Sequence, residues 1–296
     1  MTFKRRAIDL EFRLGLGGTY GESGTNTVRI SGLRVQAQID KVVGPAMGTL
    51  SMRVYGMTPD QMNALSALNQ GAETVKSNSV TVLAGNFGEV LATVFQGQIS
   101  VGQQNLNGAP ETSMLVTAFA GGLAALQPTP PASYPGSADA SVMMQNIAQV
   151  AGWHFENYGV NVQFSTPYLI GSPLDQARTV AAAGRFNFTV DDGNQDKIQT
   201  LIIWPNNGAR GGQIPLISKD TGMIGYPDYS TSLNGLTIST EFNPFIHVGG
   251  QVQIKSDLNV ANGIFTTFEI SHTLESEMPG GQWMTRFGAS TQGVTP

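Results

Sequence analysis

Residues 94–99 read Val-Phe-Gln-Gly-Gln-Ile, and residues 265–270 read Phe-Thr-Thr-Phe-Glu-Ile. Each stretch follows a short β-prone segment, at 80–82 or 252–254, and precedes another, at 114–117 or 283–285. The order strand, turn, strand, loop, strand therefore occurs twice, which indicates a duplicated β-structure. The identity between the copies is low and unrelated β-hairpins share this patterning, so both interpretations of the repeat stay open.

Alternation of apolar and polar residues predicts strands along most of the chain. Leu50, Met52 and Val54, for example, alternate with Ser51 and Arg53. Strands are expected at 33–39, 50–54, 80–84, 91–99, 114–119, 186–190, 198–204, 236–242, 252–254 and 264–274, and from Trp283 onward. The strands at 186–190 and 198–204 are expected to form a hairpin with a turn at Asp191-Asp192-Gly193.

Capping signals and apolar spacing predict three helices, at 59–68, 138–151 and 173–184. Thr58 and Gln61 form a capping box for the first helix, and Ser172 caps the third. The second ends before Gly152 and carries one apolar stripe, made of Met143, Ile147, Val150 and Ala151. The first helix is expected to bury Met62 and Leu65.

Proline and glycine at 128–131 and 135–136 mark a linker or crossing loop. The two flanking regions are rich in strands, and the segment directly after the loop holds two of the helices and a hairpin. The sequence therefore predicts a β domain over residues 1–125, an α+β module over 126–216 and a second β domain over 217–296.

Charged residues make up 12% of the 296-residue chain, against about 25% in ordinary domains. There is no cysteine, which excludes disulfides, thiolate metal sites and cysteine nucleophiles. No Lys or Arg occurs between Lys76 and Arg178, an interval that holds five acidic residues. The only basic cluster is Lys4-Arg5-Arg6, so specific DNA binding, which needs clustered basic groups, is not expected.

Neither export nor membrane insertion is expected. Asp9, Glu11 and Arg13 interrupt the segment that follows the basic N-terminus, so no apolar signal-peptide core develops. The longest nearly apolar stretch, at 114–126, is shorter than the roughly 18 residues that a spanning helix needs. We expect a soluble protein that is made in a cytoplasm.

The candidates for chemistry are few, and each has a structural interpretation. Asp191, Asp192 and Asp196 could act as acid and base in a glycosidase, but neighbouring strand residues point to opposite faces and Asp-Gly is a common turn. His272 and Glu275 could bind a metal, but His272 shares a predicted strand face with Ile264, Phe268 and Ile270, which favours a buried, hydrogen-bonded histidine.

Two further features stay structural in our interpretation. Gly15-Leu16-Gly17-Gly18 lacks the lysine of a P-loop and the spacing of a dinucleotide fingerprint, so it predicts a flexible turn or an assembly loop. Trp153 and Trp283 fit core or interface anchors, with sugar stacking as the alternative. We therefore expect no catalytic, cofactor-binding or metal-binding residues, no cofactor and no enzymatic activity.

The chain also resembles a known family, the baseplate hub proteins of contractile-tailed bacteriophages, which are related to the hub parts of type VI secretion spikes. The resemblance covers most of the chain, and the order and spacing of the matching segments make it specific. These segments are Val54-Tyr55-Gly56-Met57, residues 80–85 and 94–99, Thr221-Gly222-Met223-Ile224-Gly225-Tyr226-Pro227, Asn243-Pro244 with Gly249, residues 270–276, and Pro279-Gly280-Gly281-Gln282-Trp283.

The resemblance implies a mainly β fold with an α+β insert, in which two tube-type β-barrel domains flank the small α+β module. It implies a virion structural protein of the tail baseplate, assembled in the host cytoplasm, that forms a homotrimer and adapts the six-fold tail tube to the three-fold spike. The expected partners are the tube protein, the spike protein and other baseplate proteins, with DNA passing through the channel without specific binding. No spike or lysozyme domain follows in this sequence, so the spike is expected to be a separate chain.

The alternative function is a cell-wall glycan-binding or hydrolytic tail accessory protein. Glycan binding requires exposed aromatic side chains, and hydrolysis requires activity that depends on Asp191 or Asp192. No residue pattern favours either function over the hub.

Overall fold

The computed structural model describes residues 4–15, 18–20, 24–44, 46–66, 78–191, 198–230 and 235–290. The chain divides into two compact units. Unit 1 comprises residues 1–39, 49–123 and 272–283, and unit 2 comprises residues 40–48, 124–271 and 284–296. No helix among the described residues is long and apolar enough to cross a membrane.

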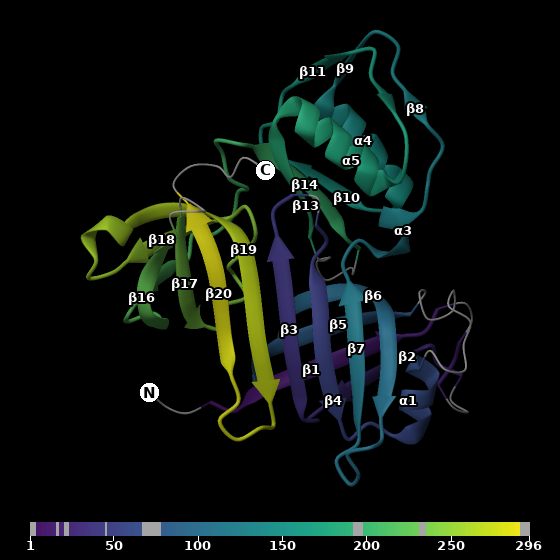
Figure 1. The fold of residues 1–296 in the computed structure, drawn as a ribbon, viewed down its shortest axis with the longest axis vertical. Helices are drawn as coiled ribbons and strands as arrows, with labels where there is room; N and C mark the ends of the chain where they lie inside the picture. The colour runs from purple at the N-terminus through teal and green to yellow at the C-terminus, as the bar shows by residue number, and fades with distance from the viewer. Residues whose placement is uncertain are drawn as a thin grey trace. The chain divides into compact units, whose positions relative to one another are not determined.

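Unit 1 is built on antiparallel strands in the order β3-β4-β7-β6-β5-β1-β2 (Figure 1). Its elements are β1 (Arg6–Arg13), β2 (Thr27–Ser31), β3 (Val35–Val42), β4 (Thr49–Tyr55), α1 (Pro59–Leu65), β5 (Ser79–Asn86), β6 (Ala92–Asn105) and β7 (Ser113–Phe119), with β3 continuing into unit 2. The alternation in each strand places its apolar side chains on one face, as Ile8, Leu10 and Phe12 show in β1. These faces form a common core.

The long strand β6 links the two halves of this sheet. Its residues 92–98 pair with β5 and its residues 98–105 pair with β7, with a register shift in each ladder. Such a strand turns a corner between two layers. Gly97 lies at the corner, where an added Cβ would stand 2.4 Å from the Phe119 carbonyl oxygen. Gly102 similarly leaves room for the backbone of Leu65 at the end of α1.

The expected capping box of α1 is present. The Gln61 N–H donates to Thr58 Oγ1, the Thr58 N–H donates to Gln61 Oε1, and Met62 and Leu65 are buried. The helix ends at Leu65 rather than near Leu68, because Ser66 adopts an extended conformation. Residues 67 and 68 lie outside the described part of the chain.

Unit 2 contains two hydrophobic cores. The first is formed by residues between Ala125 and Ile203, and the second by residues between Ile217 and Ala289. The elements after β7 are α3 (Gly122–Leu126), β8 (Ala132–Ser133), β9 (Ser137–Asp139), α4 (Ala140–Ala151), β10 (His154–Asn157), β11 (Gln163–Ser165), β12 (Tyr168–Leu169), α5 (Pro173–Gly184), β13 (Phe186–Asp191), β14 (Thr200–Pro205), β15 (Leu216–Ser218), β16 (Met223–Ser230), β17 (Gly235–Glu241), β18 (Gln251–Lys255), the 3-10 turn η3 (Asn259–Ala261), β19 (Gly263–Ser276) and β20 (Trp283–Ser290).

The first core lies between α4, α5 and the three-stranded sheet β10-β14-β13, in which β10 and β14 are parallel and β13 is antiparallel to β14 (Figure 1). The predicted hairpin is confirmed, but β13 extends through Asp191, so that residue belongs to the strand. The rest of the predicted turn, including Asp192, Gly193 and Asp196, lies outside the described residues. The two helices and this sheet form the small α+β module that the sequence predicted.

Helix α4 shows where the predicted apolar stripe was partly wrong. Met143 and Ile147 are buried, as expected, but Val150 is 63% exposed. Met144 and Ala148 are buried instead. These residues follow the i, i+4 spacing of one helix face, whereas Val150 lies beside that face.

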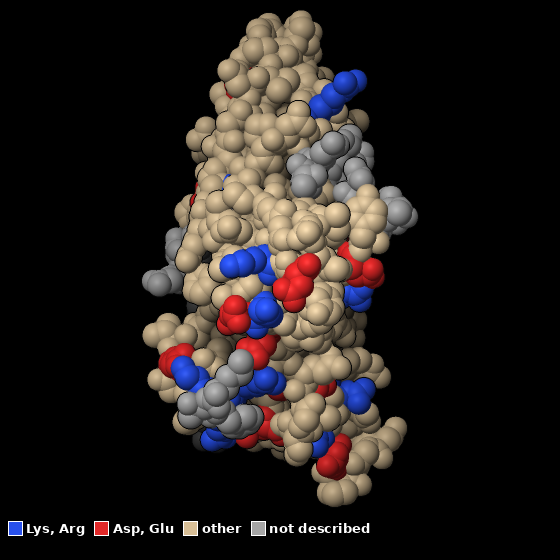
Figure 2. Space-filling model, turned by 90° about the vertical axis from the view of Figure 1, so that its left-hand side faces the viewer, with Lys and Arg blue, Asp and Glu red and all other residues tan. Residues whose placement is uncertain are grey.

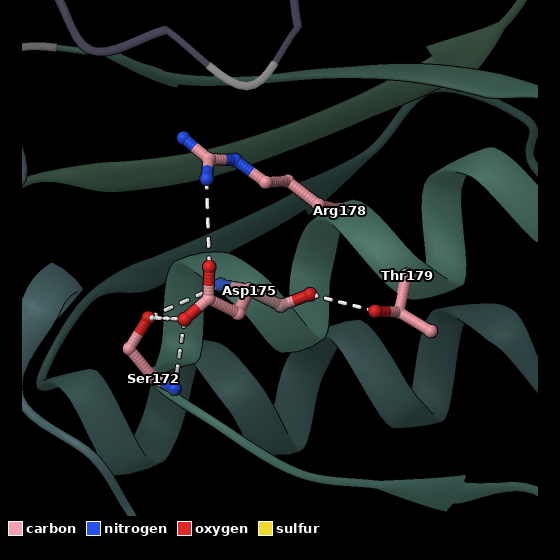
Figure 3. A network of polar contacts seen from close by, with 4 residues as sticks. All are labelled: Ser172, Asp175, Arg178 and Thr179. Carbon is pink, nitrogen blue, oxygen red and sulfur yellow. Dashed lines mark hydrogen bonds and ion pairs between the residues drawn. The ribbon is translucent and has the colours of Figure 1, made fainter.

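Helix α5 begins with a second capping box, drawn in Figure 3. Asp175 N–H donates to Ser172 Oγ, and Ser172 N–H donates to Asp175 Oδ2. The Ser172 hydroxyl also donates to Asp175 Oδ2, at 2.6 Å, and this hydrogen bond together with that from the Ser172 N–H lowers the pKa of Asp175. A negative charge at a helix N-terminus is favourable. The residue in the left-handed conformation at the other end is Arg185, not Gly184. Gly184 leaves room for the Phe186 ring, which would stand 2.6 Å from an added Cβ.

The second core is enclosed by β15 to β20. Here β17 pairs with β20, β20 is followed in the sheet by β19, and β19 pairs with β18. The order β17-β20-β19-β18 matches the order β4-β7-β6-β5 of unit 1. The long third strand is 14 residues in both sets. The sequence repeat therefore corresponds to a repeat of strand order, and the fold is mainly β with a small α+β module, as predicted.

Candidate functional surfaces

Asp191, the described member of the predicted acid pair, forms a buried ion pair. Its Oδ2 lies 2.6 Å from Nη1 of Arg210, and the two side chains are 18% and 13% exposed. Arg210 reaches this position because its backbone N–H donates to the Gly249 carbonyl at 2.8 Å. Gly249 in turn lies against the buried indole of Trp204, where an added Cβ would stand 2.5 Å from the ring.

This environment keeps Asp191 ionised. Burial alone would raise the pKa of Asp191, but the positive charges of Arg210 and Lys41 outweigh burial and lower the pKa from 3.8 to about 2. His247, which is also close, has its pKa lowered chiefly by burial. A carboxylate with so low a pKa cannot donate a proton at neutral pH. The ion pair is therefore a structural contact between β13 and the segment after β14.

The structure separates the two candidate metal ligands. His272 is buried on the core face of β19, whereas Glu275 accepts hydrogen bonds from Gln36 Nε2 at 2.9 Å and from the Gln282 N–H at 2.8 Å. The described residues contain no group of three His, Asp or Glu side chains placed to hold a metal ion.

The set of residues predicted to share a strand face with His272 was wrong at one position. Ile264 is 53% exposed, whereas Phe268, Ile270 and His272 are buried. The alternation shifts because Thr267 and Phe268 are both buried. Thr267 Oγ1 donates to the Gly250 carbonyl, which draws this polar side chain inward.

The tryptophans do not form exposed platforms. Trp153, Trp204 and Trp283 are 8%, 1% and 9% exposed, and the guanidinium of Arg6 lies 5.6 Å from the ring centroid of Trp283. In the predicted glycine turn, the Gly18 N–H donates to the Gly15 carbonyl at 3.0 Å. Leu16 and Gly17 lie outside the described residues.

Unit 1 has an outward face that is rich in amides and hydroxyls, which we call the amide face. It consists of the outward side chains of β3, β4, β7 and the end of β19, which are Gln36, Gln38, Ser51, Arg53, Leu115, Thr117, Thr273 and Glu275. Thr273 Oγ1 donates to Gln38 Oε1 at 2.8 Å. A shallow groove of about 330 Å³ lies on this face. Among these eight side chains one is positive, Arg53, and one is negative, Glu275, so their net charge is zero; the exposed Asp40 follows further along β3, in unit 2.

The outward face of β1 and β2, which we call the charged face, has a different composition. Asp9, Glu11 and Arg13 alternate along β1, and Arg29 of β2 lies opposite Glu11. Arg29 Nη2 donates to Asp9 Oδ2 at 2.7 Å. Unit 1 therefore presents one outer face of amides and hydroxyls and another of paired charges.

Charge is sparse on the α+β module. Figure 2 shows basic and acidic side chains side by side over much of the face that it displays, and an almost uncharged surface at the top, where α4 and α5 lie in Figure 1.

Three of the five acids in the stretch without Lys or Arg pair with basic residues from outside it. These pairs are Glu89 with Lys4, Glu111 with Arg34 and Asp175 with Arg178.

The comparisons with known proteins agree with this architecture. The family model described as baseplate hub gp41 matches residues 16–279. The chain belongs to the baseplate hub gp41 family. No curated protein matches the sequence. Membership in the baseplate hub gp41 family confirms the resemblance that the sequence indicated, and it makes the chain a structural component of a phage tail.

Solved structures share the fold of this baseplate hub gp41 family member at low identity. A tail protein from Neisseria meningitidis MC58 is 10% identical with a TM-score of 0.64, and the match covers 98% of each chain. The 43 kDa tail protein of prophage MuSo2 from Shewanella oneidensis is 8% identical with a TM-score of 0.63, and the match covers 99% of each chain. The E. coli c3393 protein, a type VI secretion component described as structurally similar to T4 tail proteins gp27 and gp5, is 12% identical with a TM-score of 0.62; the match covers 90% of this chain and 76% of that one.

Neither outer face of unit 1 was predicted from the sequence. The alternation that defines the charged face was present in residues 6–13, but the segment was considered only as a possible signal peptide. The amide face could not be recognised from the sequence, because its members come from four strands that are far apart in the chain. Only the pairing of those strands brings them together.

Proposed function

We propose that this hub subunit forms a homotrimer that adapts the six-fold tail tube to the three-fold spike. In this arrangement residues 1–125 and 217–296 each supply a tube-type β-barrel domain, and residues 126–216 form the insert between them. The trimer joins the tube protein, the spike protein and other baseplate proteins in the virion, and it is assembled in the host cytoplasm.

The recurring strand order carries this proposal. The β4-β7-β6-β5 set and the β17-β20-β19-β18 set have the same connectivity, and each has its own hydrophobic face. Three chains with two such sets each would give six similar units around one axis. A three-fold assembly can then match a six-fold ring through one kind of contact surface.

We further propose that the amide face lines the DNA channel. Its side chains hydrogen-bond to one another, as Gln36 does with Glu275 and Tyr55. The face lacks the cluster of aromatic and apolar side chains that protein interfaces bury at their centre. Its zero net charge would let phosphates pass without the counterion release that basic walls produce.

Lysine substitutions test the channel assignment. The double variant Gln38→Lys/Ser51→Lys adds two positive charges to the amide face, and Thr27→Lys with Ser31→Lys adds two to β2, on the charged face. The first variant is expected to slow DNA ejection from assembled virions, with the effect shrinking at high salt. The β2 variant is expected to eject DNA at the wild-type rate. Equal rates for all three proteins would overturn the channel assignment.

The mass of the native protein tests the trimer independently. Native mass spectrometry of the purified subunit, or imaging of the baseplate, is expected to show three copies. A dimer, or a single copy per particle, would overturn the adaptor function.

The buried tryptophans give no support to glycan binding, and Asp191 is held in an ion pair. Other aromatic side chains, such as Tyr226 and Phe245, are exposed, so glycan binding remains the alternative function, whereas the ion pair of Asp191 gives no support to hydrolysis.

A further inference from the structure

The two most exposed large hydrophobic side chains of the described residues are Val90, at 98%, and Val260, at 89%. Val90 lies in the turn between β5 and β6, and Val260 lies in the turn between β18 and β19. In the recurring strand order β5 corresponds to β18 and β6 to β19. The two valines therefore stand on corresponding hairpins, and we call residues 87–91 and 256–262 the hairpin tips.

The tips also share their charged neighbours. Glu89 in the first tip pairs with Lys4 at 2.6 Å, and Asp257 in the second pairs with Lys219 at 3.7 Å. Each tip thus carries a free-standing valine close to a carboxylate that is paired with a lysine. A second apolar side chain accompanies each valine, Phe87 at 64% exposure and Leu258 at 43%. The amino-acid sequences of residues 87–91 and 256–262 show no such common pattern, so the similarity is visible only in the structure.

Both tips are held in shape by local hydrogen bonds. In the first tip the Glu89 N–H donates to the Asn86 carbonyl, and the Phe87 N–H donates to the Arg5 carbonyl at 2.7 Å, with the Arg5 guanidinium 4.7 Å from the Phe87 ring centroid. In the second tip the Ser256 N–H donates to Asn262 Oδ1 at 2.6 Å, and Ala261 is buried beneath the turn. A preordered apolar tip loses little conformational entropy when it binds.

An isolated valine at the surface needs no explanation. Two valines that are nearly fully exposed, at corresponding turns and with the same charged neighbours, indicate a shared contact. We propose that the hairpin tips are anchors that insert into apolar pockets on a ring of the tail tube. The partner is a six-fold ring because each chain carries two tips and the proposed trimer carries six. This inference rests on the proposed trimeric function.

The test uses the full-length hub protein and tubes assembled from the tail-tube protein of the same virion. Co-sedimentation is measured for the wild type, for Val90→Asp, for Val260→Asp and for the double variant. The two single variants are expected to weaken binding by similar factors of at least tenfold, because each removes the corresponding half of the anchors. The double variant is expected to abolish sedimentation with the tubes.

Val150→Asp is the matched control. It makes the same substitution at an exposed valine of α4 that lies on neither tip, and binding at the wild-type level is expected. If an Asp variant has a lowered melting temperature, Val90→Ser and Val260→Ser replace it and are expected to show the same loss.

Three results would overturn the inference: full binding by the double variant, an effect of only one of the two tips, or no binding by the wild-type trimer. The native mass of each protein is recorded in parallel. A wild-type mass other than that of a trimer contradicts the proposed function. If the wild-type protein is a trimer but the tip substitutions do not change its binding to the tubes, only the anchor proposal is contradicted.

Discussion

Asp191 and Arg210 are the residues at which the structure departs most clearly from the sequence interpretation. Two adjacent aspartates before a glycine are typical of an exposed turn, yet Asp191 ends a strand and is held by a guanidinium that comes from 19 residues further along the chain. No local sequence pattern indicates that Arg210 would pair with Asp191. The contact depends on Gly249, whose backbone lies close to the Trp204 ring and accepts a hydrogen bond from the Arg210 N–H, and on the Val248 carbonyl, which accepts one from Arg210 Nη1.

Replacing Asp191 with Asn is expected to destabilise the protein by about 3 kcal/mol at pH 7, because Arg210 would keep its buried charge without a partner. Urea denaturation of both proteins measures the difference. The pKa of Asp191 is lower in the folded protein, so the stability from this group is present above about pH 4 and disappears as the pH falls towards 2. The difference in the free energy of unfolding between the wild type and Asp191→Asn should therefore disappear as the pH falls from 4 towards 2. A gap that is independent of pH would contradict the ion pair.

Gly97 provides a test of the corner in β6. An alanine Cβ at this position would lie 2.4 Å from the Phe119 carbonyl oxygen and 2.7 Å from the Phe95 ring, so the strands must move apart. Gly97→Ala is expected to cost about 1 to 3 kcal/mol, read as a lowered melting temperature. Thr93→Ala, at an exposed site of the same strand, serves as the control and is expected to melt within a degree or two of the wild type.

At the scale of the elements, α4 has one face that carries most of its stabilising contacts. Ile147→Asp would place an unpaired carboxylate in the first core of unit 2, and a loss of about 3 to 5 kcal/mol is expected. Val150→Asp, one turn further along the same helix but 63% exposed, is expected to change stability by less than about 0.5 kcal/mol. Differential scanning calorimetry of the two variants decides the point. Equal stability of both would show that the buried face has been misassigned.

The helices were predictable because their signals are local. Thr58 and Gln61 form the capping box that the sequence indicated. Ser172 was expected to cap α5, and it does so in a capping box with Asp175. The exposure of Val150 was not predictable, because the apolar stripe is compatible with two rotations of the helix. Only the packing of α4 against α5 and β10 selects between them.

The strands show the same division between local and distant information. Strands such as β4, β5, β7 and β17 were expected from alternation alone, whereas β1, with the same alternation in its sequence, was overlooked because basic residues precede it. Ile264 was assigned to the wrong face, since the shift at Thr267 and Phe268 depends on hydrogen bonds to the backbone of residues 247–250. Pairing partners, and hence both outer faces of unit 1, depend on contacts between distant segments.

At the scale of the whole molecule, the repeat of strand order offers an explanation for the low fraction of charged residues in the sequence. An exposed sheet edge usually carries charged side chains that prevent uncontrolled pairing. Here β16 is an edge strand of the described sheet and presents Ile224, Tyr226 and Tyr229 at 47%, 66% and 59% exposure. The strand carries a single charged residue, Asp228. A subunit that closes into a ring, as we propose, can leave such an edge with few charged residues, because its neighbours cover it.

The same architecture predicts that the insert is separable. The core between Ala125 and Ile203 shares no buried residue with the core between Ile217 and Ala289, and the Asp191–Arg210 ion pair lies wholly within residues 126–216. A fragment of residues 124–216 keeps α4, α5 and the β10-β14-β13 sheet, together with Ala125. It loses Met47, which packs at the edge of this core, and the contacts of Trp204 and Arg210 with Gly249.

We therefore expect the 124–216 fragment to fold as a monomer, with a cooperative thermal transition by circular dichroism below that of the full chain. Domains of this size have only a small free energy of unfolding, so the loss of these peripheral contacts should lower the transition temperature without abolishing the transition. The Ile147→Asp fragment is the control and should show no cooperative transition, because it disrupts the core that remains. A wild-type fragment that melts without cooperativity would mean that the insert depends on the flanking β-structure. Residues 126–216 would then not be a domain.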